Sequence, residues 1–201
     1  VATDGIGRGI AVGAGVLWLQ AAARPLWVLG ALTGGQLPEI ARQEGEMTQA
    51  FRNLAEELRA SWPPETLAAV DHAGAFPYYS GFRVLDMTGL NDPHIARVPG
   101  ELHGKYDVPY VLRNHPELVM LNTRHAPDVD ERTRQHGYWV GQDALVDHPA
   151  FQRCYRLLDG DTSWRWIRVP RSWFLVYALE PDGAACIDAL IDPASGAAPA
   201  R

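Results

Sequence analysis

Three short apolar runs, each bounded by polar or turn-forming residues, recur along the chain. They are TLAAV at residues 66–70, FRVLDM at residues 82–87 and ELVML at residues 117–121. A short apolar run between turn signals is typical of a buried strand. The first two runs carry an acidic residue near the C-terminal end and are joined by a Gly- and Pro-rich connection. The pattern predicts residues 66–71, 83–87 and 117–121 as neighbouring strands of one α/β sheet.

An amphipathic pattern precedes these strands. Between residues 39 and 60, apolar side chains recur at helical spacing, and charged residues occupy the other positions. The apolar positions are Ile40, Met47, Phe51, Leu54 and Leu58. Two prolines follow at residues 63 and 64, so we expect a helix that ends before them and packs its stripe against the sheet. Shorter helical segments are expected over residues 76–80 and 107–114.

The pattern changes beyond residue 122. Residues 123–141 are polar, and a loop with a short helix is expected there. Residues 151–158 and 173–179 are typical of two antiparallel strands at one edge of the sheet, with turn chemistry at residues 159–161. Residues 193–201 are expected to be a disordered tail. Since parallel neighbours need crossover connections, the elements predict a small, mostly parallel, three-layer α/β domain over residues 37–192 with an antiparallel edge hairpin.

An apolar segment lies within residues 1–36. Residues 10–32 are long enough to cross a hydrocarbon core of about 30 Å. Arg24 near their middle costs roughly 2.5 to 3.5 kcal/mol on insertion scales. Three interpretations stay open: the last transmembrane helix of a longer protein, a secretory signal or anchor, and a buried soluble helix. We expect a chain without residues 1–36 to remain folded and soluble.

Composition and charge narrow the function classes. The 201 residues are 47% hydrophobic and 21% charged, as in a globular domain with a substantial core. A net charge of −6 without a basic cluster argues against a nucleic-acid partner. Cys154 and Cys186 lack metal-ligand spacing; they could pair outside the cytoplasm, but two free buried thiols are expected. P-loop and GxSxG motifs are absent, and neither a metal nor a cofactor is expected.

The densest run of turn residues, aromatic residues and aspartates lies at residues 71–97. Its core reads GAFPYYSGFRVLDMTGLNDPHIAR, and GELHGKYDVPYVLRNHPELVMLN follows at residues 100–122. With PYYSG, DMTGLND and IAR in this order, the chain resembles the soluble C-terminal domain of bacterial polytopic glycosyltransferases of the GT-C architecture. The resemblance covers roughly residues 40–160 and is to the terminal arabinofuranosyltransferase family, which caps mycobacterial cell-wall arabinan.

This resemblance implies a membrane enzyme that uses a polyprenyl-phosphate sugar donor and a cell-envelope glycan acceptor. In that family the catalytic acid lies in an early extracytoplasmic loop between transmembrane helices, and the soluble domain follows the final membrane helix. The implied partner of this chain is therefore the transmembrane region of the same protein. The implied location is the extracytoplasmic, periplasmic side of the cell membrane, and no catalytic residue is expected in the chain. The start at Val1, without a methionine, suits the C-terminal part of a larger enzyme.

Four candidate ligand-binding residues come from the strand ends and the turn between them. Asp71 and Asp86 end two predicted parallel strands, at the edge where open α/β sheets bind ligands, although such carboxylates equally cap turns or helices. Tyr78 and Tyr79 in PYYSG offer aromatic faces and hydroxyl groups to sugar rings, and one of them is expected in the core.

Two further candidates lie in the HGK sequence. His103 and Lys105 fall where the resembled family has a similar Gly, His and Lys cluster, and together they suit an anionic group such as a phosphate. A solvated basic loop is the alternative.

Two function classes remain. The first is the extracytoplasmic domain of a glycosyltransferase, which binds glycan weakly while the missing membrane part performs the reaction. The second is an independent secreted or membrane-anchored α/β hydrolase, with Asp71 or Asp86 acting with His103, or a small sugar-binding domain.

Overall fold

The computed structural model describes residues 36–101, 104–125, 130–158 and 173–192. The predicted apolar segment at residues 10–32, the turn at residues 159–161 and the C-terminal tail lie outside these residues. Within the described ranges, no helix combines the length and the apolar character needed to cross a membrane.

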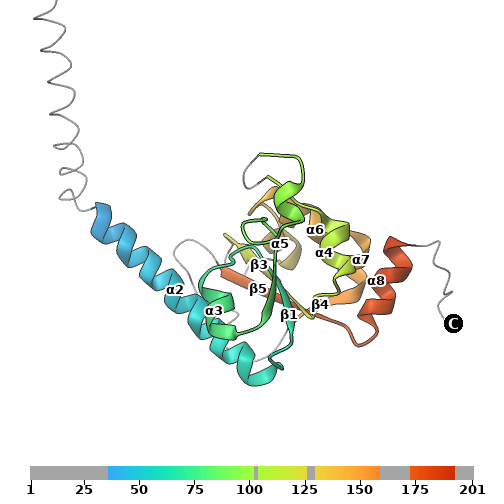
Figure 1. The fold of residues 1–201 in the computed structure, drawn as a ribbon, viewed down its shortest axis with the longest axis horizontal. Helices are drawn as coiled ribbons and strands as arrows, with labels where there is room; N and C mark the ends of the chain where they lie inside the picture. Colours follow the sequence, from blue (N-terminus) through green and yellow to red (C-terminus); the bar gives the residue numbers. More distant parts are fainter. Residues whose placement is uncertain (1–35, 102–103, 126–129, 159–172, 193–201) are drawn as a thin grey trace, which may run out of the picture. The chain divides into compact units, whose positions relative to one another are not determined.

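The described residues form a mixed α/β fold with one five-stranded sheet (Figure 1). The elements in chain order are α2 (Gln36–Ser61), β1 (Leu67–Val70), α3 (Ala75–Ser80), β2 (Arg83–Asp86), the 3-10 helix η1 (Ile95–Arg97), α4 (Val108–Arg113), β3 (Leu118–Thr123), α5 (Glu131–Gln135), α6 (Val140–Val146), α7 (Pro149–Cys154), β4 (Tyr155–Leu157), β5 (Trp173–Leu179) and α8 (Gly183–Ile191).

The sheet has the strand order β2-β1-β3-β5-β4. Strand β1 pairs in parallel with both β2 and β3, whereas β5 pairs antiparallel with β3 and with β4. The three strands predicted from apolar runs are therefore confirmed as members of one sheet, and the pair at the C-terminal edge is antiparallel as expected. The sheet is mixed, because its two C-terminal strands contribute antiparallel pairings.

Both faces of the sheet are buried, and alternate strand residues point to opposite faces. On one face, Val70, Met120 and Val176 pack with residues of α2 and with Phe76 of α3. On the other face, Val119, Leu121 and Leu175 pack with residues of α4, α6, α7 and α8. Figure 1 shows the same division of the helices between the two sides of the strands.

Helix α2 belongs to two compact units, which divide between Gly45 and Glu46. In the first unit, exposed side chains of the helix form local ion pairs, such as that of Arg42 with Glu39 at 2.7 Å. In the second unit, Phe51, Leu54 and Leu58 are buried, so the predicted apolar stripe is confirmed there. Ile40, the first position of the predicted stripe, is 52% exposed.

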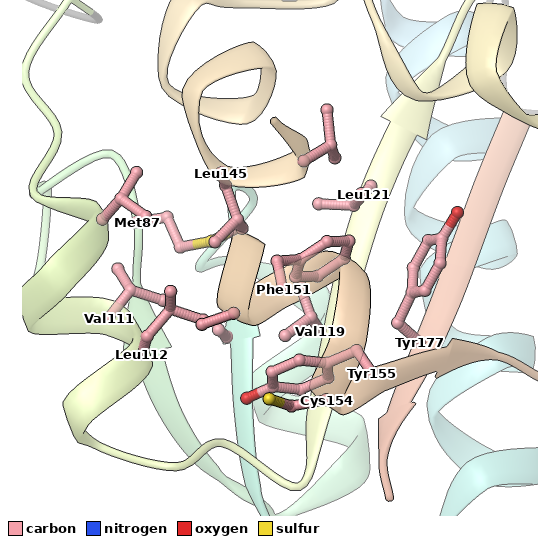
Figure 2. Packing of buried hydrophobic residues seen from close by; sticks show 14 of the residues in the cluster. Met87, Val111, Leu112, Val119, Leu121, Leu145, Phe151, Cys154, Tyr155 and Tyr177 are labelled. Carbon is pink, nitrogen blue, oxygen red and sulfur yellow. The ribbon is translucent and has the colours of Figure 1, made fainter. Parts of the chain in front are cut away.

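Helix α7 corrects one sequence prediction. Residues 151–158 were expected to form a strand, but Pro149–Cys154 is helical and strand β4 is limited to Tyr155–Leu157. Pro149 lies in the first turn of the helix, a favourable position for proline, and the His148 side chain caps the helix by accepting from the Ala150 amide. The buried residues Ala150, Phe151 and Cys154 have helical spacing, and Figure 2 shows the Phe151 ring within the core.

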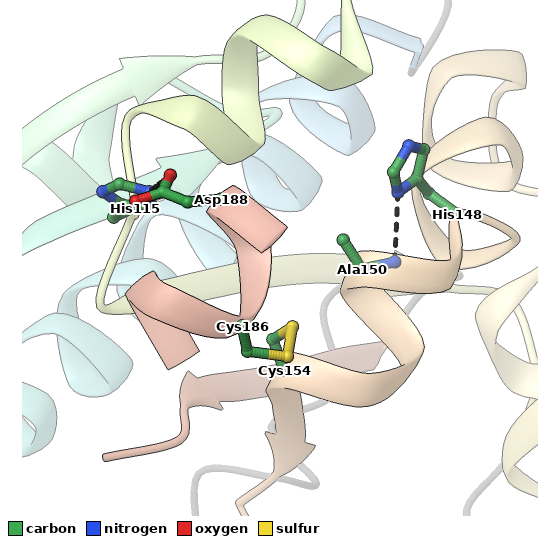
Figure 3. The surroundings of a disulfide bond; sticks show 6 residues. All are labelled: His115, His148, Ala150, Cys154, Cys186 and Asp188. Carbon is green, nitrogen blue, oxygen red and sulfur yellow. Dashed lines mark hydrogen bonds and ion pairs between the residues drawn. A yellow bond between two sulfur atoms is a disulfide. The ribbon is translucent and has the colours of Figure 1, made fainter. Parts of the chain in front are cut away.

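The two cysteines correct a second prediction. Cys154 of α7 and Cys186 of α8 form a disulfide, with Cα atoms 5.9 Å apart and 32 residues of sequence separation (Figure 3). They are not free thiols. On the opposite side of α8, Asp188 pairs with His115 at 2.7 Å. The disulfide and this pair fix α8 to the elements that precede it.

Candidate functional site

Strands β1 and β3 are neighbours in the sheet, and the connections that follow them leave for opposite faces. The chain leaves the C-terminal end of β1 towards α3, which packs on the α2 face. It leaves the C-terminal end of β3 towards α5 and α6, and α6 packs on the opposite face. In open α/β sheets, the place where consecutive connections diverge to opposite faces is a crevice in which ligands bind.

Asp71 and Asn122 lie at the ends of these two strands and contact each other. The Nδ2 atom of Asn122 donates to Oδ1 and Oδ2 of Asp71 at 2.6 and 2.7 Å. Both residues are buried, with exposed fractions of 7% and 1%. A buried carboxylate needs donors to offset the loss of water, and Asn122 supplies one from the neighbouring strand.

His72 completes this group, which we call the crevice cluster: Asp71, His72, Asn122 and Tyr138. The Nδ1 atom of His72 lies 2.8 Å from Oδ1 of Asp71. Because a carboxylate only accepts hydrogen bonds, Nδ1 donates, and Nε2 of the neutral ring is then an acceptor. The His72 side chain remains 33% exposed. The cluster thus joins a buried carboxylate to an imidazole that reaches solvent.

Aromatic rings hold His72 on two sides. Its ring centroid lies 5.2 Å from that of Phe51 on α2 and 6.4 Å from that of Tyr138. The guanidinium carbon of Arg124 lies 5.5 Å from the centroid of the Tyr138 ring. A partly exposed aromatic surface beside hydrogen-bonding groups suits a ligand with both apolar C–H faces and hydroxyl groups.

The Gln142 side chain forms two hydrogen bonds with the backbone of Asn122 in the crevice cluster. It is fully buried, its Oε1 accepts from the Asn122 backbone amide at 3.2 Å, and its Nε2 donates to the Asn122 carbonyl at 2.8 Å. The same Nε2 donates to the carbonyl of Gln135 at 2.6 Å. Helices α5 and α6 are therefore tied to the end of β3, and Tyr138 lies between them.

A shallow, open hollow of about 520 Å³ lies beside this segment. It is lined by His125, Arg132, Thr133, His136, Gly137 and Asp147. The His136 ring contacts the Arg132 carbonyl at 2.7 Å and Asp147 Oδ1 at 3.0 Å. The hydrogen bond to the carbonyl, and after it the pairing with Asp147, raise the pKa of His136 against the opposing effect of burial.

Asp86, a predicted ligand-binding residue, organises its own loop. Its Oδ1 accepts from the backbone amide and the hydroxyl of Thr88 at 2.9 and 2.7 Å, and its Oδ2 accepts from the Asn91 amide at 2.6 Å. The residue is 2% exposed. These contacts match the capping alternative for this carboxylate, and they fix the loop that follows β2.

Tyr78 and Tyr79 lie on α3, with ring centroids 5.0 Å apart. Tyr78 is 82% exposed, whereas Tyr79 packs against the α2-side core, with the Arg52 guanidinium 5.2 Å from its ring. One tyrosine of the pair was expected in the core; Tyr79 is partly buried and packs against the core. The Tyr78 ring contacts Tyr79, and Tyr79 contacts α2.

The other two predicted residues lie in the HGK loop. His103 lies outside the described residues. The Nζ atom of Lys105 donates to the carbonyl of Ala96 at 2.7 Å, which ties the loop to η1. Lys105 thus has a structural contact, as in the alternative of a basic loop.

The residues that carry the family resemblance build a compact loop after β2. Before η1, Asp92 accepts from the amides of His94 and Ile95, each at 2.9 Å, and Tyr110 donates its hydroxyl to Asp92 at 3.0 Å. The His94 ring stacks on Tyr110 at 3.9 Å. Gly89 has a φ of +76°, and a Cβ there would lie 2.8 Å from the Ala96 backbone nitrogen. The motif is therefore explained largely by folding requirements.

Of the six predicted residues, Asp71 is the one in the crevice cluster, and sequence reasoning missed its partners. Asn122 directly follows the predicted third strand and His72 follows Asp71, so a survey of every polar residue at a strand end would have included both. No such signal was available for Tyr138. In the described part of the chain, no three His, Cys, Asp or Glu side chains are arranged to hold a metal ion.

Comparison with known proteins gives one result. No curated protein and no solved structure matches the chain. A family model described as a domain of unknown function, DUF8728, matches residues 38–177, which include the sheet strands β1 to β4, most of β5 and the whole crevice cluster. Since this match covers well over half of the 201 residues, the chain belongs to the DUF8728 family.

Proposed function

We propose that this chain is the extracytoplasmic C-terminal domain of a polytopic glycosyltransferase, and that it holds the glycan while the membrane region performs the transfer. The observation that carries the proposal is the crevice cluster. It presents a hydrogen-bonded carboxylate, an amide, an imidazole and a tyrosine ring at the edge of the sheet where α/β proteins bind ligands.

Two further observations support this proposal. The motifs PYYSG, DMTGLND and IAR resemble those of the glycosyltransferase family, in which a donor carried on polyprenyl phosphate supplies the sugar. The disulfide between Cys154 and Cys186 is of the kind that persists in oxidising compartments and is rare in the cytosol, which favours the extracytoplasmic side of the membrane.

The mixed chemistry of the cluster suits a sugar. With Nδ1 of His72 donating to Asp71, Nε2 of the ring provides an acceptor for a sugar hydroxyl, and the His72 and Tyr138 rings provide faces for C–H groups. Each hydroxyl contact replaces a contact with water and contributes only about 0.5 to 1.5 kcal/mol. The isolated domain should accordingly bind oligosaccharide weakly.

The test uses the protein encoded by the complete reading frame, with its membrane region, in a glycosyl-transfer assay. His72→Phe keeps an aromatic ring between Phe51 and Tyr138 but removes the ring nitrogens. His94→Phe is the matched control, because His94 also pairs with an aspartate, Asp107 at 2.7 Å, and stacks on a tyrosine.

His72→Phe should lower transfer several-fold while His94→Phe leaves it close to the wild-type rate. Equal rates in wild type and His72→Phe would contradict the proposed role of the crevice. Tyr79→Ala and Lys105→Ala, at two other residues predicted from the sequence, are also expected to lower transfer without unfolding the domain.

A hydrolase is the second candidate, and the contact between Asp71 and His72 favours it. A carboxylate that orients an imidazole is the arrangement of a general base. In this alternative His72 takes the role that the sequence suggested for His103. Hydrolysis by the 201-residue chain alone would support this candidate. Glycosyl transfer by that chain alone would contradict the proposal that the membrane region performs the transfer.

A further inference from the structure

The hollow beside the crevice cluster has the composition of a second sugar subsite. This inference rests on the proposed function. The hollow has a volume of about 520 Å³, within the range of roughly 300 to 1,000 Å³ that is common for small-molecule sites. Its lining offers a guanidinium, two imidazoles, a hydroxyl and a carboxylate.

The charges of the hollow are nearly balanced. Arg132 lies 3.9 Å from Asp147, and both side chains are largely exposed, at 77% and 55%. His136 also pairs with Asp147. A second carboxylate, that of Asp143, accepts from the Gly137 amide of the hollow's wall at 2.8 Å. Cationic and anionic groups alternate over a short distance, which favours a neutral ligand that both donates and accepts hydrogen bonds.

Two residues of the hollow's wall are next in sequence to residues that contact or belong to the crevice cluster. Gly137 in its wall directly precedes Tyr138, whose ring faces His72. His125 in its wall directly follows Arg124, whose guanidinium lies over the Tyr138 ring. Tyr138 therefore belongs to the crevice cluster and directly follows a residue of the hollow's wall.

We infer that the hollow of His125, Arg132, Thr133, His136 and Asp147 is a second glycan subsite, which binds a neutral sugar unit next to the one held at the crevice cluster. Arg132 and His125 contribute donors to its hydroxyl groups, and Asp147 contributes an acceptor. An oligosaccharide crosses the Tyr138 ring between the two subsites. The domain therefore recognises at least two consecutive sugars and binds single sugars more weakly.

The test is an NMR titration of the 201-residue chain with arabinotriose, maltotriose, cellotriose and mannotriose, and with trigalacturonic acid as the acidic probe. The variants are Arg132→Ala and His125→Ala in the hollow and His72→Phe in the crevice. Arg153→Ala, an exposed arginine on α7, is the matched control. Loss of an exposed ion pair costs little stability, so Arg132→Ala should fold even if His125→Ala does not.

We expect Arg132→Ala and His125→Ala to weaken the tightest neutral trisaccharide by about two- to tenfold, as loss of one or two hydrogen bonds does. Arg153→Ala should leave the affinity unchanged. Wild-type affinity in Arg132→Ala, together with weaker binding by His72→Phe, would overturn the second subsite and leave the crevice intact. Tighter binding of trigalacturonic acid than of every neutral trisaccharide would overturn the neutral class. Absence of binding by all five sugars would overturn both the subsite and the proposed function.

Discussion

The side-chain amide of Asn122 reaches both carboxylate oxygens of Asp71, at 2.6 and 2.7 Å, across 51 residues of sequence. The contact joins the ends of two parallel strands at the position where their connections leave for opposite faces of the sheet. It also explains how a carboxylate can be buried there, because a short polar side chain from the neighbouring strand replaces water.

Asn122→Ala should lower the free energy of unfolding by about 1 to 3 kcal/mol, because Asp71 loses a donor in a buried position. Chemical denaturation measures this change. Asn91→Ala is the control, since Asn91 is exposed and its hydrogen bond to Asp86 comes from the backbone amide. A loss of stability as small as that of the control would show that the Asn122 side chain is not needed to bury Asp71.

Gly89→Ala should destabilise the domain by at least about 2 kcal/mol, because φ is positive and a Cβ would overlap the Ala96 backbone. Gly45→Ala is the contrasting variant. No atom lies within 4 Å of a Cβ at Gly45, and alanine favours the helix that contains it, so this change should not destabilise the chain. Thermal unfolding compares the two, and equal melting temperatures would refute the steric argument for Gly89.

Loss of the Cys154–Cys186 disulfide should lower the free energy of unfolding by about 3 to 4 kcal/mol, from the loop entropy of 32 residues. The measurement is denaturant unfolding of the Cys154→Ser, Cys186→Ser double variant beside the wild type. A reducing agent should weaken the wild type to the level of the double variant and leave that variant unchanged. If reduction does not change the wild type, the cysteines do not pair in solution.

His148 should make stability depend on pH. Its Nδ1 accepts from the Ala150 amide at 3.2 Å and caps α7 (Figure 3), and burial lowers the pKa of His148. The folded pKa is therefore below the unfolded value of about 6.5. The unfolded chain takes up the proton first as the pH falls, so this stabilisation is complete above about pH 6.5 and is lost below it.

His148→Asn keeps an N-cap side chain but does not titrate. The difference in stability between wild type and this variant, measured from pH 8 to pH 5, should shift in favour of the variant as the pH falls. A constant difference over that range would mean that His148 does not titrate as described.

The sequence predicted those parts of the fold that depend on local pattern. The runs at residues 66–70 and 117–121 became β1 and β3 because they are short, apolar and bounded by turns, and the helix before them ends ahead of Pro63. Alternation at residues 151–158 was misleading, because His148 and Pro149 start a helix whose buried residues, Ala150, Phe151 and Cys154, have helical spacing. The disulfide was missed because its two helices meet only in the folded chain.

The candidate site was harder to predict from the sequence, because its contacts join residues that are far apart along the chain. Asp71 was found from its position at a strand end, but its contact with Asn122 requires β1 and β3 to be neighbours, and the chain visits β2 between them. Asp86 has the same position in the sequence pattern, yet its carboxylate binds its own loop. A strand-end aspartate is therefore a sound candidate, and its neighbours across the sheet decide what it can do.

A sugar that binds this domain should contact the His72 ring directly. The measurement is the NMR signal of the His72 ring nitrogens in the 201-residue chain, assigned by their loss in His72→Phe, during titration with the neutral trisaccharide that binds tightest. We predict that the His72 signals shift progressively and saturate, while the signals of His94 stay in place. Saturable binding that moves the His94 ring and leaves the His72 ring unchanged would contradict the account.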